Sequence, residues 1–264
     1  MKIKANGILI NYEITGSGDF ILLIHGSGDN LKAWYNQIPA FSKEYRVLTF
    51  DLRGHGQTEL GGDYNFDTWA DDVYGLLKAL DIDKAYILGY SMGGSIAATF
   101  TIKHPEMVKA LVLSNSGGFP ATEENIRLLA QRRQVQIEAM DKEGMPGVFE
   151  LRKKGTFSPG FTEKHHEVME KYRDVLMGNR VEGYKAVLQS TVSHGPIEFF
   201  RITCPVLVIV GEHDAFSGPE SGRTLQGMIA GSELKIFPTG HASGMEVPED
   251  YNRTVLDFLA RARK

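Results

Sequence analysis

One serine in the chain has the surroundings of an activated nucleophile. Ser91 lies in the stretch LGYSMGGS, with Gly89 two residues before it and Gly93 two residues after it. This spacing fits the Gly-x-Ser-x-Gly nucleophile elbow, in which the serine occupies the apex of a sharp turn from a strand into a helix. Small flanking residues let the chain cross closely, and the first amides of the helix then point to the place where negative charge develops. The apolar run before Gly89 favours this interpretation over a plain turn.

A serine hydroxyl is a weak nucleophile unless a base activates it and an acid orients that base. The partners of such an elbow follow in the order serine, acid, histidine, in loops at the carboxyl ends of later strands. Among eight histidines, His241 is the one that directly follows a late strand-like segment, LKIF. Asp214 ends Gly-Glu-His-Asp after the VLVIV run and is the acid candidate, with Glu212 as a nearby alternative. We predict a triad of Ser91, Asp214 and His241.

An acyl-transfer site also needs two donors for the oxyanion. One should be the amide of Met92, directly after the nucleophile, where a helix begins. The other should come from the turn His-Gly-Ser-Gly after the FILLI run, and we predict the Ser27 amide, with Gly28 as the alternative. We expect His25 to form a hydrogen bond within this loop rather than to take part in chemistry. We likewise expect Glu246 to be a hydrogen-bond partner within its loop.

Composition excludes several classes of function. The chain has 264 residues, 42% of them apolar, a formal net charge of −4 and a pI near 6.1. This length and composition suffice for a substantial core, and nothing indicates binding to nucleic acid or to an acidic membrane. The only cysteine, Cys204, allows no intramolecular disulfide, and we expect a buried structural thiol. The N-terminal MKIKANGILI lacks the long apolar stretch of a signal peptide, which favours a cytoplasmic protein.

Strand-like and helix-like segments alternate at both ends of the chain. Asn6-Gly7 between two strand-like runs predicts an opening hairpin, and the later buried runs, separated by amphipathic helices, predict a mostly parallel sheet with helices on both faces. Asp67 can cap the helix that begins near it. The predicted strands are 2–5, 8–15, 20–24, 45–50, 85–88, 108–113, 206–210 and 234–237, and the predicted helices are 66–80, 92–103, 222–229 and 251–262.

The middle of the chain breaks this alternation. From 119 to 200 there is no convincing buried strand, and helical stretches are expected at 123–142, 161–176 and 181–194, joined by Gly-Met-Pro-Gly and Ser-Pro-Gly. We therefore predict a helical cap (lid) at 119–200, inserted into a core domain made of 1–118 and 201–264. Its cationic runs, Arg132-Arg133 and Arg152-Lys153-Lys154, could meet a substrate carboxylate, but a solvated surface is the preferred interpretation.

Several motifs, taken together and in order, resemble those of the α/β-hydrolase superfamily across essentially the whole chain. They are His25-Gly26-x-Gly28 with Trp34 downstream, Asp51-x-Arg53-Gly54-His55-Gly56, Gly-Tyr-Ser-Met-Gly-Gly, Gly-Glu-His-Asp and Gly-His-x-Ser. The resemblance implies an eight-stranded, mostly parallel sheet whose second strand is antiparallel, and a helical cap over the active site. It also implies that the turn from Asp51 to Gly56 is structural. The segment from Gly240 to Glu249 is similar to that of 3-oxoadipate enol-lactonases.

These residues predict a serine hydrolase that cleaves a small-molecule ester or lactone through an acyl-enzyme and needs no metal or organic cofactor. A carbon–carbon bond hydrolase of vinylogous diketones from aromatic degradation is the alternative. A cofactor-free haloperoxidase-like activity, or a non-catalytic ligand-binding member of the superfamily, is a weaker one. Haloalkane dehalogenases use an aspartate nucleophile, so Ser91 excludes their mechanism.

Overall fold

The computed structural model describes residues 1–117, 122–190 and 196–263. Eight strands form one sheet in the order β1-β2-β4-β3-β5-β6-β7-β8. β1 pairs antiparallel with β2, β2 antiparallel with β4, and the remaining neighbours are parallel, as predicted. The strands are β1 (Lys2–Ala5), β2 (Ile8–Thr15), β3 (Phe20–Ile24), β4 (Arg46–Phe50), β5 (Ala85–Tyr90), β6 (Val108–Ser114), β7 (Val206–Gly211) and β8 (Glu233–Phe237).

The hairpin between β1 and β2 has the turn that its sequence predicts. Asn6 and Gly7 both have positive φ, 45° and 81°, and Ala5 pairs with Ile8 across the turn. Two central residues with positive φ match the right-handed twist of the flanking strands, which is why Asn-Gly favours this connection.

Helices cover both faces of the sheet because successive residues of its buried strands point to opposite sides. In β3, Leu22 and Ile24 belong to the core cluster that contains side chains of α2 (Phe66–Ala79) and α3 (Met92–Lys103). Ile21 and Leu23 belong to the cluster that contains side chains of α1 (Ile38–Phe41) and α11 (Pro248–Ala262). Helix α9 (Pro219–Met228) contributes Leu225 to the first cluster.

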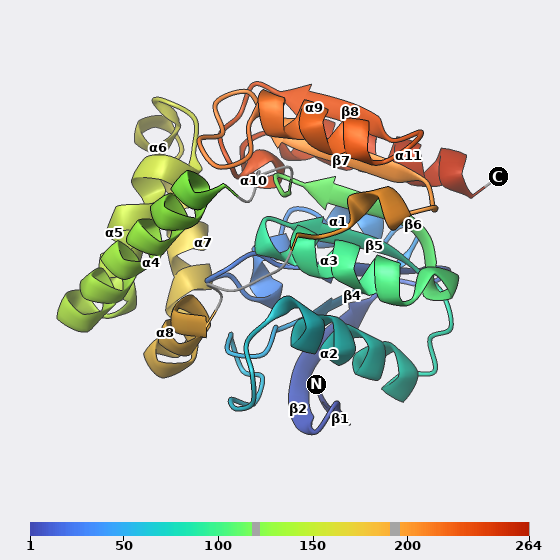
Figure 1. Cartoon of the computed structure of the whole chain (residues 1–264), viewed down its shortest axis with the longest axis horizontal. Coiled ribbons are helices and arrows are strands. Elements are labelled where there is room, and N and C mark those ends of the chain that lie inside the picture. Colours follow the sequence, from blue (N-terminus) through green and yellow to red (C-terminus); the bar gives the residue numbers. More distant parts are fainter. Residues whose placement is uncertain (118–121, 191–195, 264) are drawn as a thin grey trace.

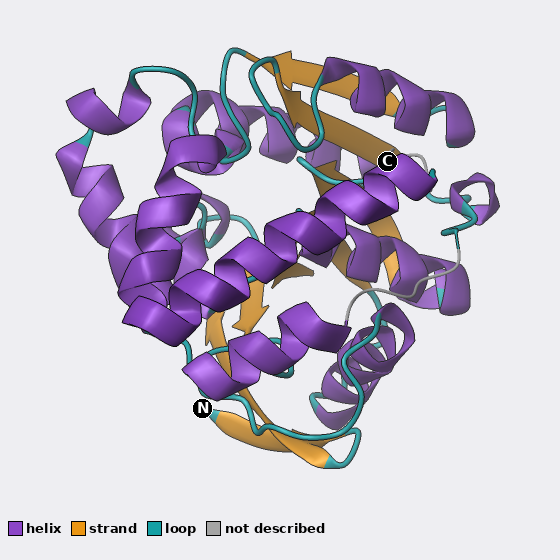
Figure 2. Cartoon of the chain, turned by 60° about the vertical axis from the view of Figure 1, so that its left-hand side comes forward, coloured by secondary structure: helices purple, strands orange, loops and turns teal. Residues whose placement is uncertain are grey.

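The helices between β6 and β7 lie to one side of the sheet and its covering helices (Figure 1). They are α4 (Glu123–Glu143), α5 (Met145–Thr156), α6 (Phe161–Lys164), α7 (His166–Met177) and α8 (Val181–Ser190), and we refer to them as the helical insertion. Figure 2 brings this insertion forward, with strands of the sheet behind it. Its helices share a core cluster that also includes Ala242 and Met245, which follow β8. The predicted division at 118/119 falls outside the described residues, as do residues 191–194 of a predicted helix.

Two local predictions were wrong. Gly-Met-Pro-Gly is not a connection, because α5 begins at Met145 with Pro146 in its first turn. Proline is well accommodated there, since the first amides of a helix have no intrahelical acceptor. The cap of α2 is Asn65, whose side chain accepts from the Thr68 amide at 2.8 Å, rather than Asp67.

Smaller elements complete the chain. They are the 3₁₀ turns η1 (Leu31–Trp34), η2 (Pro105–Met107) and η3 (Phe199–Arg201) and the short helix α10 (Ser243–Glu246). Cys204 is half-buried against the core, and burial raises the pKa of its thiol to about 11, which agrees with a structural role. Within the described ranges, no helix is both long and apolar enough to span a bilayer.

Candidate active site

Ser91 occupies the turn between β5 and α3 in a strained backbone conformation. Its φ is 54° and its ψ −119°, values that non-glycine residues seldom adopt. The chain crosses itself so closely here that a Cβ on Gly89 would strike the Gly93 carbonyl, and a Cβ on Gly93 would strike the Ile24 carbonyl. The two glycines of the motif are therefore required by contact with backbone, and the strain at Ser91 is typical of a functional turn.

The three residues of the predicted triad lie within hydrogen-bonding distance of one another. His241 Nε2 is 2.9 Å from Ser91 Oγ, and His241 Nδ1 is 2.8 Å from Asp214 Oδ2. Because an ionised carboxylate only accepts, the imidazole proton resides on Nδ1, and Nε2 is free to accept the serine hydroxyl proton. Glu212, the alternative acid, is exposed.

Asp214 is fixed by its own loop. Its Oδ1 accepts the amides of Phe216 and Ser217 at 2.8 and 3.0 Å, and its Oδ2 accepts the Ser217 hydroxyl at 3.0 Å. Burial alone would raise the pKa of Asp214, but the charge and hydrogen bond of His241, together with these amides, outweigh it. The pKa of Asp214 therefore lies well below its usual range, and the group stays ionised.

The imidazole of His241 is held between two aromatic rings. The Tyr90 ring centroid is 5.3 Å and the Phe216 ring centroid 5.0 Å from that of His241. The His241 amide donates to the Thr156 carbonyl of α5 at 2.7 Å. Glu246 accepts the Gly240 amide at 2.8 Å and the Ser158 amide at 3.2 Å, which confirms its expected role within the loop. The histidine loop is thus attached to the helical insertion.

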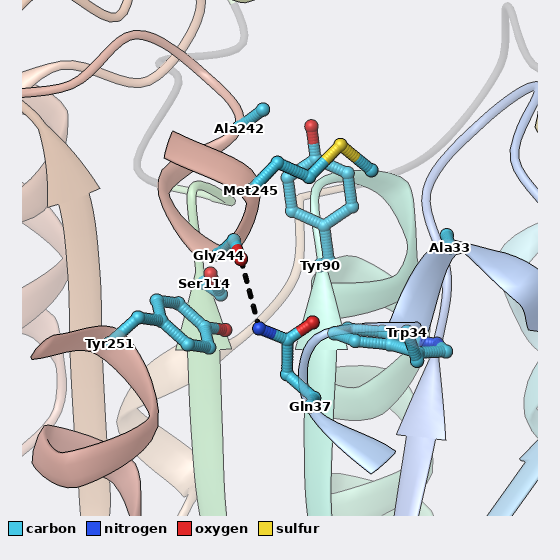
Figure 3. A pocket seen from close by; sticks show the side chains of 9 residues that line it. All are labelled: Ala33, Trp34, Gln37, Tyr90, Ser114, Ala242, Gly244, Met245 and Tyr251. Carbon is cyan, nitrogen blue, oxygen red and sulfur yellow. Dashed lines mark hydrogen bonds between the residues drawn. The ribbon is translucent and has the colours of Figure 1, made fainter. Parts of the chain in front are cut away.

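A small cavity of about 20 Å³ lies beneath this loop (Figure 3). It has room for one water molecule. The Gln37 side chain donates to the Gly244 carbonyl at 3.0 Å and so gives the loop a second support (Figure 3). Its lining residues are Ala33, Trp34, Gln37, Tyr90, Ser114, Ala242, Gly244, Met245 and Tyr251.

The predicted oxyanion donors border the same large cavity as Ser91. Met92 is the first residue of α3, so its amide has no acceptor inside that helix. Within the described ranges the Ser27 amide donates to no protein group either. The amide of Gly28, the alternative donor, is occupied, because it donates to His55 Nε2 at 3.0 Å. The geometry therefore favours Ser27 over Gly28.

Two buried histidines support this turn. His25 Nδ1 contacts the Gly26 carbonyl at 2.8 Å, as expected, and its Nε2 accepts the Leu52 amide at 3.0 Å. Burial lowers the pKa of both His25 and His55, so both rings are neutral and can accept backbone amides. Asp51 Oδ1 accepts the Leu31 amide at 2.8 Å, which agrees with a structural role for the turn that begins there.

The main cavity has a volume of about 620 Å³ and lies between the sheet edge and the helical insertion. Three arginines of the insertion line it, Arg132 and Arg133 of α4 and Arg152 of α5. The expectation that these arginines form a solvated surface was therefore wrong. Arg152 is directed to the turn after β3, where it donates to the Ser27 carbonyl at 2.5 Å. A surface role does fit Lys153, which pairs with Glu150.

Arg132 and Arg133 have no acidic partner. Neither forms an ion pair within the described ranges, and residues 118–121, 191–195 and 264 include no Asp or Glu. The Arg132 guanidinium lies over the Phe216 ring at 4.5 Å, and its Nη1 is buried without a hydrogen-bond acceptor. Burial lowers the pKa of Arg133, with only Tyr184 opposing, as expected for a cation without a nearby carboxylate.

Sequence reasoning missed several residues of this site. Asn115 donates to Asp214 at 3.1 Å, and its position just after β6 was a usable signal, because carboxyl ends of parallel strands meet at one edge. Phe216, two residues after the acid, could also have been noticed. Thr156 and Arg152 had no such signal, since they lie in an insertion whose placement depends on tertiary packing.

Comparisons with known proteins identify the family and the fold. Residues 19–144 match the model of the alpha/beta hydrolase fold. The chain is 34% identical to a 2-hydroxymuconate semialdehyde hydrolase of Pseudomonas sp. strain CF600, over 99% of this chain and 94% of the relative. It is 30% identical to 3-oxoadipate enol-lactonase 2 of Acinetobacter baylyi, over 98% and 96%. A thermophilic esterase from Thermogutta terrifontis superposes with a TM-score of 0.90 at 28% identity, with both chains covered completely. The chain belongs to the α/β-hydrolase family.

Proposed function

We propose that this protein is a serine hydrolase that cleaves a small carboxylic ester or lactone. The observation that carries the proposal is the chain of contacts from Ser91 through His241 to Asp214, at 2.9 and 2.8 Å, beside a cavity of small-molecule size. The relatives named as an enol-lactonase and an esterase support this bond type.

The mechanism follows from the positions of these groups. The Ser91 hydroxyl attacks the substrate carbonyl while His241 Nε2 takes its proton, and Asp214 stabilises the imidazolium that forms. The amides of Ser27 and Met92 bind the oxyanion. His241 then protonates the leaving alkoxide and activates the water that cleaves the acyl-enzyme, so the site returns to its starting state.

The substrate should carry a carboxylate. Arg132 and Arg133 line the cavity without acidic partners in the described ranges, and the buried Nη1 of Arg132, which has no acceptor, favours an anionic ligand. Arg132, Phe216 and His241 follow one another along one wall. Because His241 protonates the leaving alkoxide, the carboxylate should belong to the leaving-group portion of the substrate.

Cleavage of a carbon–carbon bond is the second candidate. It is favoured by the 34% identity to a 2-hydroxymuconate semialdehyde hydrolase over 99% of the chain. The same serine, base and oxyanion donors could serve that reaction, with a carbanion equivalent leaving in place of an alkoxide.

One experiment tests both candidates. Wild type, Ser91→Ala and the control Ser17→Ala, which changes an exposed loop serine, are assayed against p-nitrophenyl esters, lactones and vinylogous diketones. We expect ester or lactone turnover by wild type and Ser17→Ala, at least a thousandfold loss in Ser91→Ala, and labelling of Ser91 by a fluorophosphonate probe. Full activity of Ser91→Ala would refute the mechanism, and turnover of the diketone far above that of every ester would favour carbon–carbon cleavage.

A further inference from the structure

The turn that carries the Ser27 amide is fixed by hydrogen bonds on its core side. The Gly26 carbonyl accepts the Asp29 amide at 3.2 Å, and the Gly28 amide donates to His55 Nε2 at 3.0 Å. These bonds lock the peptide units on either side of Ser27. Ser27, in contrast, borders the cavity, and its N–H donates to no protein group within the described ranges.

The helical insertion holds the other side of the same turn. Arg152 Nη1 donates to the Ser27 carbonyl at 2.5 Å, and Asn179 Nδ2 donates to the Gly28 carbonyl at 2.7 Å. In the opposite direction, Asn30 Nδ2 donates to the Val175 carbonyl of α7 at 2.6 Å. Three hydrogen bonds within four consecutive residues therefore connect the turn to the insertion.

Arg152 is also the counterion of a buried carboxylate. Asp29 is 1% exposed, and neither of its carboxylate oxygens has a hydrogen bond. Arg152 Nη2 lies 4.0 Å from Asp29 Oδ1. A buried charge without a partner is strongly unfavourable, so Asp29 favours the guanidinium at this place. Gly28, with a φ of +75°, lies against Arg152 and Tyr184, and a Cβ there would strike both.

The same helix reaches the histidine loop. Thr156, the last residue of α5, accepts the amides of His241 and Ala242 at 2.7 and 3.2 Å. One turn earlier in α5, Arg152 holds Ser27. Helix α5 therefore contacts both the loop of the general base and the turn of the oxyanion donor.

We propose that Arg152 is a positioning residue for the oxyanion hole: by holding the Ser27 carbonyl and pairing with Asp29, it aims the Ser27 N–H at the oxygen of the tetrahedral intermediate. The insertion then completes the catalytic machinery besides shaping the pocket. This inference rests on the proposed serine mechanism.

The test compares three variants on a neutral substrate, ethyl butyrate, which leaves the cavity's anion preference out of the measurement. Arg152→Met removes the donor and leaves Asp29 as an unpaired buried charge. The double variant Arg152→Met/Asp29→Asn removes the donor and the charge together. Lys153→Met is the matched control, because this neighbouring cation pairs with Glu150 and lies over the Phe149 ring rather than holding the Ser27 turn. The readouts are kcat, KM, thermal unfolding, and the affinity for a neutral trifluoromethyl ketone that forms a tetrahedral adduct with Ser91.

We expect Arg152→Met to be the least stable variant and the double variant to recover stability. In the double variant kcat should fall about tenfold to a hundredfold with KM little changed, and the affinity for the ketone should fall by a similar factor. Lys153→Met should match wild type. Wild-type kcat and ketone affinity in the double variant would overturn the proposal, as would a change confined to KM.

Failure of this inference is distinguishable from failure of the serine mechanism. Fluorophosphonate labelling of Ser91 in wild type, and its loss in Ser91→Ala, report on the nucleophile whatever the role of Arg152. If Ser91 is labelled while the double variant behaves as wild type, the mechanism stands and the positioning role is wrong.

Discussion

Asn115 and His241 share one oxygen of the catalytic acid candidate. The Asn115 side chain donates to Asp214 Oδ2 at 3.1 Å, and His241 Nδ1 lies 2.8 Å from the same atom. Asn115 follows β6, the strand beside the one that carries Ser91, and its φ is +47°. The orientation of Asp214 is thus set by the strand next to the nucleophile as well as by its own loop.

Removal of this hydrogen bond should slow the reaction. Asn115→Gly accepts the positive φ and loses the donor, and we expect kcat to fall about tenfold, because the bond to a charged group contributes about 1.5 kcal/mol. Asn115→Asp should cost more, since it places a second carboxylate beside Asp214 and disfavours ionisation of the pair. Steady-state kinetics from pH 5 to 9 measure both effects. Unchanged kcat in both variants would show that the loop of Asp214 alone orients the acid.

Arg132 and Arg133 should give the site a preference for substrates that carry a carboxylate. We expect Arg132→Gln to lower kcat/KM for the butyrate ester of glycolic acid about tenfold to a hundredfold, because a charge-assisted hydrogen bond is lost. Ethyl butyrate, which has no carboxylate, should be cleaved as by wild type, and monoethyl succinate, whose carboxylate is on the acyl side, should be less affected. A pH-stat follows acid release from all three esters.

The control for this series is Arg127→Gln, which removes an exposed arginine of the same helix. Equal losses in Arg127→Gln and Arg132→Gln would point to the overall charge of α4 and against a specific contact.

The buried histidines should make the fold sensitive to mild acid. Burial holds the pKa of His25 and His55 below the ordinary histidine value of about 6.5, so the unfolded chain binds more protons than the folded one below that pH. The contribution of the two neutral histidines to the free energy of unfolding is therefore complete above about pH 6.5. It is lost as the pH falls towards their pKa values in the folded protein. Urea unfolding midpoints between pH 8 and 5 should decline accordingly.

His55→Gln should flatten this decline, because it removes one of the two groups. His166→Gln, which changes an exposed histidine of α7, should leave the slope as in wild type. An unchanged slope in His55→Gln would assign the acid sensitivity to other groups.

Gly28 should tolerate no side chain. Gly28→Ala adds the cost of a positive φ, about 1 kcal/mol, to a clash of the new Cβ with Tyr184 and Arg152. Gly160→Ala is the matched control, since Gly160 has a φ of +77° and open space where the Cβ would lie. We expect the free energy of unfolding to fall by about 1 kcal/mol in Gly160→Ala and by clearly more in Gly28→Ala, as measured by urea titration. Equal losses would mean that the turn yields to the added methyl group.

Much of the core could be predicted from the sequence, because its strands have apolar patterns that can be recognised in short segments. Continuous apolar runs such as FILLI and VLVIV mark strands buried on both faces, and each predicted strand is present with its ends shifted by two residues or fewer. Ser91, Asp214 and His241 could be predicted because each lies in the loop after a predicted strand, and the topology brings those strand ends together. The mostly parallel pairing was predicted from the alternation of buried runs with amphipathic helices, whereas the number of strands and the antiparallel second strand came from the resemblance.

The insertion was less predictable for a physical reason. Its helices have weaker apolar patterns than the strands, and Pro146 lies in the first turn of a helix where a connection was expected. Whether Arg132 or Arg152 points to solvent or into a cavity depends on how α4 and α5 dock on the core, which no local pattern encodes. For the same reason the contact of Thr156 with the histidine loop had no counterpart in the sequence.

The two hydrogen bonds that the Thr156 carbonyl accepts also constrain how molecules reach the site. Helix α5 cannot move away from the core as a rigid lid without breaking its hydrogen bonds to the His241 loop. An opening on that side would therefore displace the general base each time a substrate entered. We expect substrate and product to pass instead along α4, several of whose residues between Leu128 and Gln136 border the cavity. A disulfide or a bulky side chain placed across that margin should slow substrate exchange, whereas one that fastens α5 to the core should leave turnover intact.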